Sequence, residues 1–114
     1  VLGLTFKENV PDLRNSKVPD IISELREYGI KVFAYDPIAE SEEAVAEYGI
    51  HLVEWGKMKE LDGLVVAVAH KKFSDMSIED LLKPLRNQKQ AVVIDVKSIL
   101  EPSHIPASIR YWRL

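Results

Sequence analysis

Short apolar runs alternate along the chain with segments whose apolar residues recur every three or four positions, and this alternation constrains the fold more than any other feature. The apolar runs cover residues 1–6, 30–35, 64–69 and 91–96. An order of strand, helix, strand, helix is typical of βαβ units, in which neighbouring strands run parallel. The sequence therefore predicts an α/β fold, a Rossmann-like three-layer sandwich with a mostly parallel sheet and helices on both faces.

The first helix is indicated by an apolar stripe with steps of three and four residues. Its members are Val18, Ile21, Ile22, Leu25 and Tyr28. Ser16 is the predicted N-cap, Pro19 lies in the first turn, and Gly29 is expected to follow the last helical residue. Further predicted elements are helices at about 39–48 and 77–85, a helical turn at 57–61, and short strands at 50–54 and 109–114.

Length and composition exclude several classes of protein. With 114 residues, 46% of them hydrophobic, the chain is expected to form one compact domain, residues 1–114, around a single core. The absence of cysteine excludes disulfides, thiolate metal sites and cysteine-based catalysis within this chain. A net charge of −3 gives no general attraction to nucleic acid, and no apolar run is long enough to span a membrane. Val1 begins inside an apolar run without a signal peptide, which suggests a piece of a longer, cytoplasmic protein.

The loop at residues 7–16, between the first strand and the first helix, is long and contains no glycine. A dinucleotide-binding turn needs glycines so that backbone amides can approach the pyrophosphate, so the chain lacks the glycine-rich dinucleotide fingerprint. Any ligand here must be bound by side chains. Lys7 at the end of a strand, and Arg14 beside a helix N-terminus with free N–H groups, suit an anion. The alternative is that Lys7–Glu8 and Asp12–Arg14 are solvated ion pairs on an ordinary loop.

Polar residues also follow the other predicted strands. Asp36, in an Asp-Pro pair, is interpreted as a turn initiator rather than as an acid that binds ribose. His70 is expected either to face a ligand or to be simply exposed, and it has no partners at metal-ligand spacing. Lys97 belongs to the same edge of the sheet, whereas Tyr111 and Trp112 are expected to pack an edge strand. No set of nucleophile, base and orienting residue is visible, so these residues favour a binding module for a phosphorylated small molecule.

The motif GLTFKEN at residues 3–9, followed by Asp12, Arg14, Asn15 and Ser16, resembles the signature that opens the C-terminal domain of the UDP-glucose/GDP-mannose dehydrogenase family. Later motifs follow in the same order. They are Tyr-Asp-Pro at 35–37, His-x-x-Phe at 70–73 and Asp-Val-Lys at 95–97. The resemblance covers essentially the whole chain, and FKENVPDLRNSKV with AVAHKKF is most similar to UDP-N-acetylhexosamine dehydrogenases of bacterial surface-polysaccharide synthesis.

The resemblance implies an activity and a division of labour. Enzymes of this family oxidise the C6 hydroxymethyl group of a UDP-sugar to a carboxylate, with two NAD and a thioester on a cysteine. The NAD-binding domain and that cysteine belong to segments outside this chain. The chain itself would be the UDP-sugar-binding domain, the C-terminal part of a longer dehydrogenase that forms a homodimer or higher homo-oligomer. The expected substrate is UDP-N-acetylglucosamine or UDP-N-acetylgalactosamine.

The resemblance also implies roles for five residues. Phe6 and Lys7 would contact the UDP-sugar, and His70 would border the nucleotide pocket, through either its side chain or its backbone. Lys97 stands where the family usually has an arginine that contacts the nucleotide-sugar. Arg14 would reach NAD. No catalytic residue and no metal ligand is expected.

Two other interpretations of the sequence are open. The chain could be a stand-alone nucleotide-binding or oligomerisation module without a dehydrogenase partner. It could also be the matching domain of a UDP-glucose or GDP-mannose dehydrogenase. A dinucleotide fingerprint and a cysteine-bearing segment upstream of Val1 would favour a dehydrogenase over the first alternative.

Overall fold

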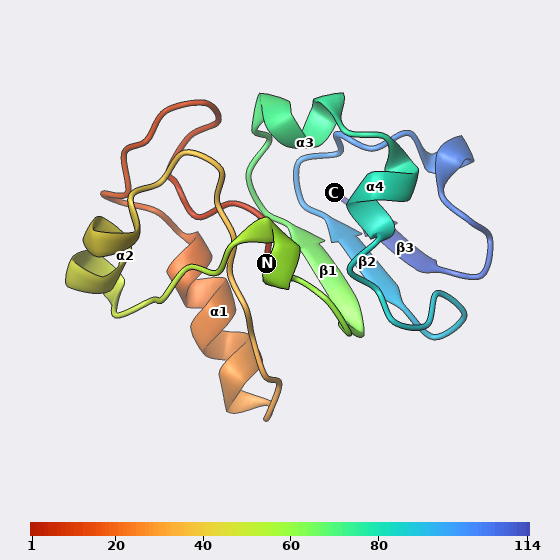
Figure 1. The fold of residues 1–114 in the computed structure, drawn as a ribbon, viewed down its shortest axis with the longest axis horizontal. Coiled ribbons are helices and arrows are strands. Elements are labelled where there is room, and N and C mark those ends of the chain that lie inside the picture. The colour runs from red at the N-terminus through yellow and green to blue at the C-terminus, as the bar shows by residue number, and fades with distance from the viewer.

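The computed structural model describes residues 1–114 and contains a three-stranded parallel sheet (Figure 1). Its strands are β1 (Gly63–Val66), β2 (Val92–Asp95) and β3 (Arg110–Arg113), in the order β1-β2-β3. Val66 pairs with Asp95, which in turn pairs with Arg113. The carboxyl ends of all three strands therefore lie at one edge of the sheet.

Isolated parallel bridges extend this sheet beyond β1. Leu2 bridges both Val66 and Tyr35, and Ala34 bridges Leu52. The segments therefore lie in the spatial order Leu52, Ala34, Leu2, β1, β2, β3. If the six segments are numbered by their order along the chain, this spatial order reads 3-2-1-4-5-6, which is the strand order of doubly wound dinucleotide-binding folds. The predicted Rossmann-like parallel architecture is confirmed.

The first three predicted strands are present only as these single bridges. The reason at the first segment is visible in its hydrogen bonds. The Leu2 amide donates to Val65 in ladder fashion, at 2.8 Å. The Gly3 amide still donates to the Tyr35 carbonyl, at 2.8 Å. The next two amides, those of Leu4 and Thr5, donate instead to the side chain of Asp36. The ladder therefore ends after Gly3, although the chain runs in the predicted place.

Four helices cover the sheet. They are α1 (Val18–Glu27), α2 (Ser41–Tyr48), α3 (Lys71–Asp75) and α4 (Ile78–Leu82), with short 3-10 turns η1 (Trp55–Lys57) and η2 (Pro102–His104). Ile22 of α1 and Ala44 of α2 belong to one buried cluster, whereas Phe73 of α3 and Leu81 of α4 belong to another. The sheet thus separates two apolar layers, instead of the single core that composition led us to expect. None of the helices has the length and apolar character needed to cross a membrane.

Helix boundaries differ from the predicted ones where side chains form hydrogen bonds with backbone groups. The N-cap of α1 is Lys17, not Ser16. The Ser16 hydroxyl donates to the Leu4 carbonyl at 2.6 Å and accepts the Val18 amide at 3.2 Å, so it ties the helix start to the first segment. Gly29 follows the helix with φ +80°, as predicted.

Three further elements depart from the sequence-based expectation. The helix expected at 77–85 is the shorter α4, which begins after Ser77, whose hydroxyl accepts the Asp80 amide at 3.1 Å. The turn expected at 57–61 lies earlier, as η1. The short helix α3 was not anticipated, because its five residues are too few to show a helical period.

Candidate functional site

The order of the segments reverses between Leu2 and β1, and ligands of doubly wound sheets bind at the carboxyl edge of such a switch point. Residues 5–17 leave the first segment there, and residues 67–70 leave β1. We call residues 5–17 the switch-point loop. It lies beside the start of α3 and the end of α2, and it is the place where the sequence predicted a ligand.

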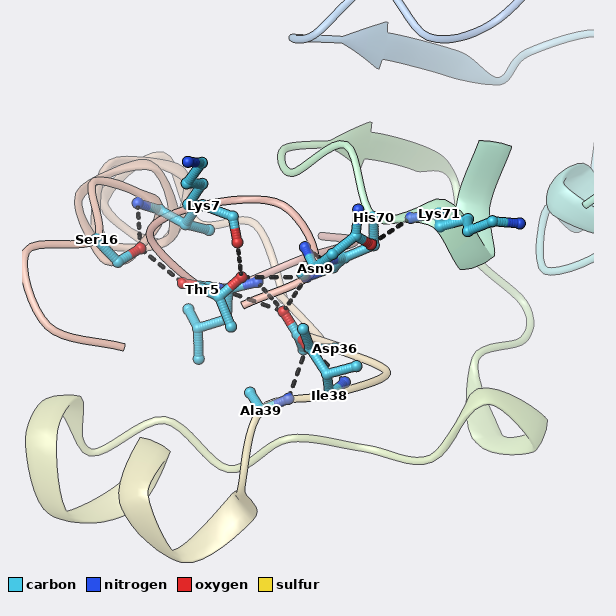
Figure 2. Close-up of polar contacts among 11 residues, drawn as sticks. Thr5, Lys7, Asn9, Ser16, Asp36, Ile38, Ala39, His70 and Lys71 are labelled. Carbon is cyan, nitrogen blue, oxygen red and sulfur yellow. Dashed lines mark hydrogen bonds and ion pairs between the residues drawn. The ribbon is translucent and has the colours of Figure 1, made fainter. Parts of the chain in front are cut away.

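Beneath this loop, Asp36 connects segments that are distant in sequence (Figure 2). Its Oδ2 accepts the amides of Leu4 at 2.6 Å and Thr5 at 3.2 Å. Its Oδ1 accepts the amides of Ile38 and Ala39, each at 2.9 Å. The role of turn initiator is confirmed, and the same carboxylate also fixes the end of the first segment.

The His70 imidazole completes this cluster. Its Nε2 lies 2.9 Å from Asp36 Oδ2 and 3.1 Å from the Thr5 hydroxyl, and its Nδ1 accepts the Asn9 amide at 3.0 Å. Since an amide N–H only donates, Nδ1 is unprotonated and Nε2 carries the proton. The Thr5 hydroxyl donates to the Lys7 carbonyl at 3.0 Å, so its oxygen is free to accept from Nε2. The imidazole is therefore neutral, and its tautomer is assigned by its partners.

The carboxylate of Asp36 is ionised at neutral pH. Burial acts to raise its pKa, but hydrogen bonds from the side chain of His70 and from the amides of Leu4, Ile38 and Ala39 outweigh burial and lower the pKa to about 2. Its side chain has no exposed surface. An ionised carboxylate in such a place is stable only because its oxygens are so fully hydrogen-bonded.

Further bonds hold the switch-point loop at both ends. Asn9, which adopts the left-handed conformation with φ +62°, accepts the Lys71 amide at the start of α3 through its Oδ1, at 2.8 Å. The Tyr48 hydroxyl, at the end of α2, donates to the Leu13 carbonyl and accepts the Ser16 amide. The loop is thus a fixed structure and not a free tether.

Phe6 and Lys7 are both exposed residues of this loop. Phe6 is 59% exposed, although its amide donates to the Asp12 carbonyl at 3.0 Å. The ammonium end of Lys7 is directed away from the buried cluster (Figure 2) and forms no ion pair, with Glu8 or with any other acid. An exposed apolar residue and an unpaired cation therefore follow one another in the chain at the switch point.

Arg14 is also at the surface, but it already has a partner. Its Nε and Nη2 bond to the two carboxylate oxygens of Asp12 at 3.1 and 3.2 Å, with 80% of the Arg14 side chain exposed. The hydrogen bonds and charge of Asp12 raise the pKa of Arg14, and the reverse effect lowers that of Asp12. The alternative of a solvated ion pair is confirmed for Asp12–Arg14. A ligand of Arg14 would have to compete with this pair.

The first turn of α1 offers fewer free amides than the sequence suggested. The Val18 amide donates to Ser16, the Asp20 amide donates to the Lys17 carbonyl at 3.2 Å, and Pro19 has no N–H. The prediction of free N–H groups at this helix start was wrong at these positions. Positive charge at the switch point therefore comes mainly from side chains.

His70 does not occupy either place that the sequence suggested for its side chain. It is 1% exposed, so the imidazole neither faces a ligand nor lies free at the surface. Its carbonyl accepts the amides of Phe73 and Ser74 in the first turn of α3. The sequence does indicate that Asp36 and His70 share one edge of the sheet. It gives no sign that the switch-point loop covers them.

Lys97 is exposed just after β2, on the same edge of the sheet. The turn that carries it is built on Asp95, which accepts the amides of Ile99 and Leu100 and the Tyr111 hydroxyl, at 2.8–3.1 Å. Burial and the bond to Asp95 raise the pKa of Tyr111 to about 12. Tyr111 thus packs the edge strand as predicted, whereas Trp112 is 69% exposed, so the same prediction was wrong for Trp112. Lys97 lies beyond β1 as seen from the switch-point loop.

Thr5, His70 and Asp36 resemble a nucleophile, base and acid, but their geometry does not serve catalysis. In a hydrolytic triad the two imidazole nitrogens contact different partners, whereas here Thr5 and Asp36 both contact Nε2. The Thr5 side chain is also buried. No group of three or more histidine, aspartate and glutamate side chains converges at metal-binding distance.

Gly3 shows how the switch point differs from a dinucleotide cradle. It has φ +96°, and a Cβ added there would lie 2.5 Å from the Cβ of Val68. The space that this glycine leaves is therefore filled by the chain that follows β1. The residues here do not fit an NAD pyrophosphate, in agreement with the missing glycine fingerprint.

Comparison with known proteins decides the family. Residues 1–102 match the UDP-glucose/GDP-mannose dehydrogenase family, UDP binding domain. The chain belongs to this family. It is 45% identical over 101 residues to the UDP-N-acetyl-D-glucosamine 6-dehydrogenase of Pseudomonas aeruginosa, covering 89% of this chain and 24% of that protein. It is 40% identical over 114 residues to protein CapL of Staphylococcus aureus, covering 100% of this chain and 26% of CapL.

The solved structure of a UDP-D-ManNAc dehydrogenase from Pyrococcus horikoshii superposes with a TM-score of 0.72 at 24% identity. The match covers 96% of this chain and 24% of that one, and it shows that the fold is shared. The chain thus spans about a quarter of the length of the proteins it matches.

Proposed function

We propose that residues 1–114 form the UDP-sugar-binding domain, the C-terminal part of a longer, cytoplasmic NAD-dependent dehydrogenase. The whole enzyme would oxidise the C6 hydroxymethyl group of UDP-N-acetylglucosamine or UDP-N-acetylgalactosamine to a carboxylate, for the synthesis of a surface polysaccharide such as a capsule. The observation that carries this proposal is the switch-point loop, which presents Phe6 and an unpaired Lys7 at the edge where this fold binds ligands.

The two side chains suit different parts of such a ligand. The ammonium group of Lys7 would neutralise a diphosphate oxygen or donate to sugar hydroxyls. The exposed ring of Phe6 offers an apolar face to the sugar or base. Lys97 would contact the nucleotide-sugar from beyond β1, and the backbone of His70 would border the pocket. Binding energy gained on the UDP half holds C6 in position for reaction elsewhere in the enzyme.

NAD, which accepts the hydride in this family, would be bound mainly by the rest of the protein. Within this chain only Arg14 is proposed to contact it, after exchanging its bonds to Asp12 for bonds to the cofactor. The whole protein is proposed to act as a homodimer or a higher homo-oligomer. This chain's own part in the reaction is to bind and orient the UDP-sugar.

The test uses the full-length protein, NAD and a panel of UDP-sugars, with NADH formation as the readout. NADH formation with UDP-N-acetylhexosamines, and far less with UDP-glucose, is the expected result. Activity with UDP-glucose or GDP-mannose alone would make this chain the matching domain of the corresponding enzyme instead. No NADH with any sugar nucleotide, from a folded protein that binds UDP, would favour a binding module without dehydrogenase activity.

A further inference from the structure

We propose that His70 and Asp36 are positioning residues for the UDP-sugar site: they hold the switch-point loop through Asn9 and Thr5, and so fix Phe6 and Lys7 for binding. This inference rests on the proposed function, because it assigns these two residues to the same site. It differs from the expectation drawn from the sequence, in which His70 itself faces the ligand.

The first support is where the two side chains lie. Both are buried and fully enclosed, so neither touches a ligand from its present position. They nevertheless join four parts of the chain that meet at the switch point. These parts are the end of the first segment, the switch-point loop, the turn before α2 and the start of α3 (Figure 2). Purely local stability would not require the cluster to be centred beneath a ligand-binding loop.

The second support is a continuous chain of hydrogen bonds that ends on Lys7. Asp36 accepts from His70 Nε2, which also lies within bonding distance of the Thr5 hydroxyl, and that hydroxyl donates to the Lys7 carbonyl. The Lys7 carbonyl additionally accepts the Val10 amide at 3.4 Å. The backbone of Lys7 is therefore set by groups that are themselves fixed by the buried pair.

The third support is the second contact of His70, on the other side of Lys7. The Asn9 amide donates to His70 Nδ1, and the Asn9 side chain accepts the Lys71 amide. Asn9 has the left-handed conformation, which asparagine tolerates, and these two bonds hold it at a fixed place. Lys7 and Glu8 thus lie between two points anchored to one imidazole. A ligand that meets a loop already ordered does not lose affinity to the ordering of that loop.

The two nitrogens of His70 can be tested separately, because amide side chains replace them one at a time. In His70→Gln the side-chain amide lies near the position of Nε2 and can still donate to Asp36, but the acceptor for Asn9 is lost. In His70→Asn the side-chain oxygen lies near Nδ1 and can still accept from Asn9, but the donor to Asp36 is lost. His70→Gln therefore releases the loop, and His70→Asn disturbs the buried carboxylate of Asp36.

A positioning role predicts opposite effects in the full-length protein. His70→Gln should keep the melting temperature close to that of the parent. It should raise KM for the UDP-sugar about fivefold, the equivalent of one hydrogen bond of about 1 kcal/mol, with a smaller change in kcat. His70→Asn should lower the melting temperature more and raise KM less. If KM follows the melting temperature in both variants, the role is structural only and the proposal is overturned.

Hydrogen exchange of the peptide that contains Asn9, measured without ligand, separates failure of this inference from failure of the proposed function. Faster exchange in His70→Gln than in the parent is expected. Unchanged exchange would overturn the loop-holding role, whatever the protein binds. Faster exchange with an unchanged KM would overturn the positioning role and leave the UDP-sugar activity standing. If the parent shows no UDP-sugar activity, the proposed function fails, and with it the positioning role.

Asn9 supplies a matched pair on the other side of the contact. Asn9→Asp keeps a side-chain oxygen for the Lys71 amide and tolerates the left-handed conformation. Asn9→Gly keeps the conformation and the backbone amide but removes that oxygen. Because Asn9 is exposed, both variants are expected to fold. Exchange in the loop should be faster in Asn9→Gly than in Asn9→Asp. Equal exchange in the two variants would contradict the second anchor.

Discussion

The replacement Asp36→Asn tests the buried carboxylate directly. Five hydrogen-bond donors point at its two oxygens, so an amide in this place turns an NH2 group toward at least two of them. Loss of a buried, hydrogen-bonded charge of this kind costs about 3 kcal/mol in the free energy of unfolding. We expect that loss at neutral pH, measured by urea unfolding of parent and variant.

The pH dependence of this difference provides the sharper check. The pKa of Asp36 falls from 3.8 to about 2 on folding, which corresponds to about 2 kcal/mol because one pKa unit is worth about 1.4 kcal/mol. A lowered folded-state pKa stabilises the fold above the unfolded-state value. That stabilisation is lost as pH falls through about 4 toward 2. The gap between parent and Asp36→Asn should therefore shrink by about 2 kcal/mol over that range.

Comparison with a second carboxyl makes the test specific. Asp12 also has a lowered pKa, through its bonds with Arg14, but it is exposed to solvent. Asp12→Asn should therefore change the free energy of unfolding little at any pH, because surface ion pairs contribute little. If the gap for Asp36→Asn is the same at neutral and at acid pH, Asp36 is not a buried ionised group, and the argument built on it is wrong.

Three kinetic predictions concern the full-length protein. Lys7→Ala should lower kcat/KM for the UDP-sugar by the equivalent of about 1.5–3 kcal/mol, the worth of a charge-assisted hydrogen bond; an unchanged kcat/KM would remove Lys7 from the site. Arg14→Ala should chiefly raise KM for NAD, and unchanged NAD dependence would count against its assigned contact. Lys97→Arg restores a planar fork that can bind two oxygens, so it should lower KM for the UDP-sugar, and a higher KM would argue that Lys97 does not face the nucleotide.

The parallel architecture could be predicted from the sequence because the first three apolar runs each precede a segment of helical period, and few folds accommodate that order. Strand boundaries at the first three segments could not. There the backbone pairs at single residues, and the amides of Leu4 and Thr5 bond to a side chain instead. Ser16 was assigned to the wrong cap position for a similar reason, since its hydroxyl also serves the Leu4 carbonyl.

The burial of His70 is the clearest limit of what the sequence could indicate. Its partners lie far away along the chain: Asp36 by 34 positions, Asn9 by 61 and Thr5 by 65. Asp36 and His70 each follow a predicted parallel strand, so the sequence could predict that they lie at the same edge of the sheet. Enclosure depends on how the switch-point loop folds back over them. That path is fixed by single hydrogen bonds to α2 and α3, and the spacing of apolar residues in the sequence does not indicate such bonds.

The contact of Gly3 with Val68 bears on any effort to redesign this domain for another nucleotide. A side chain at position 3 would meet both the Cβ and the backbone nitrogen of Val68, at 2.5 and 2.9 Å, whatever residues 7–16 contain. Alanine at position 68 would not relieve this contact, because alanine keeps both of these atoms. The two backbone segments would have to move apart before position 3 could hold any residue but glycine, so a redesign that changes Gly3 begins with a loss of packing.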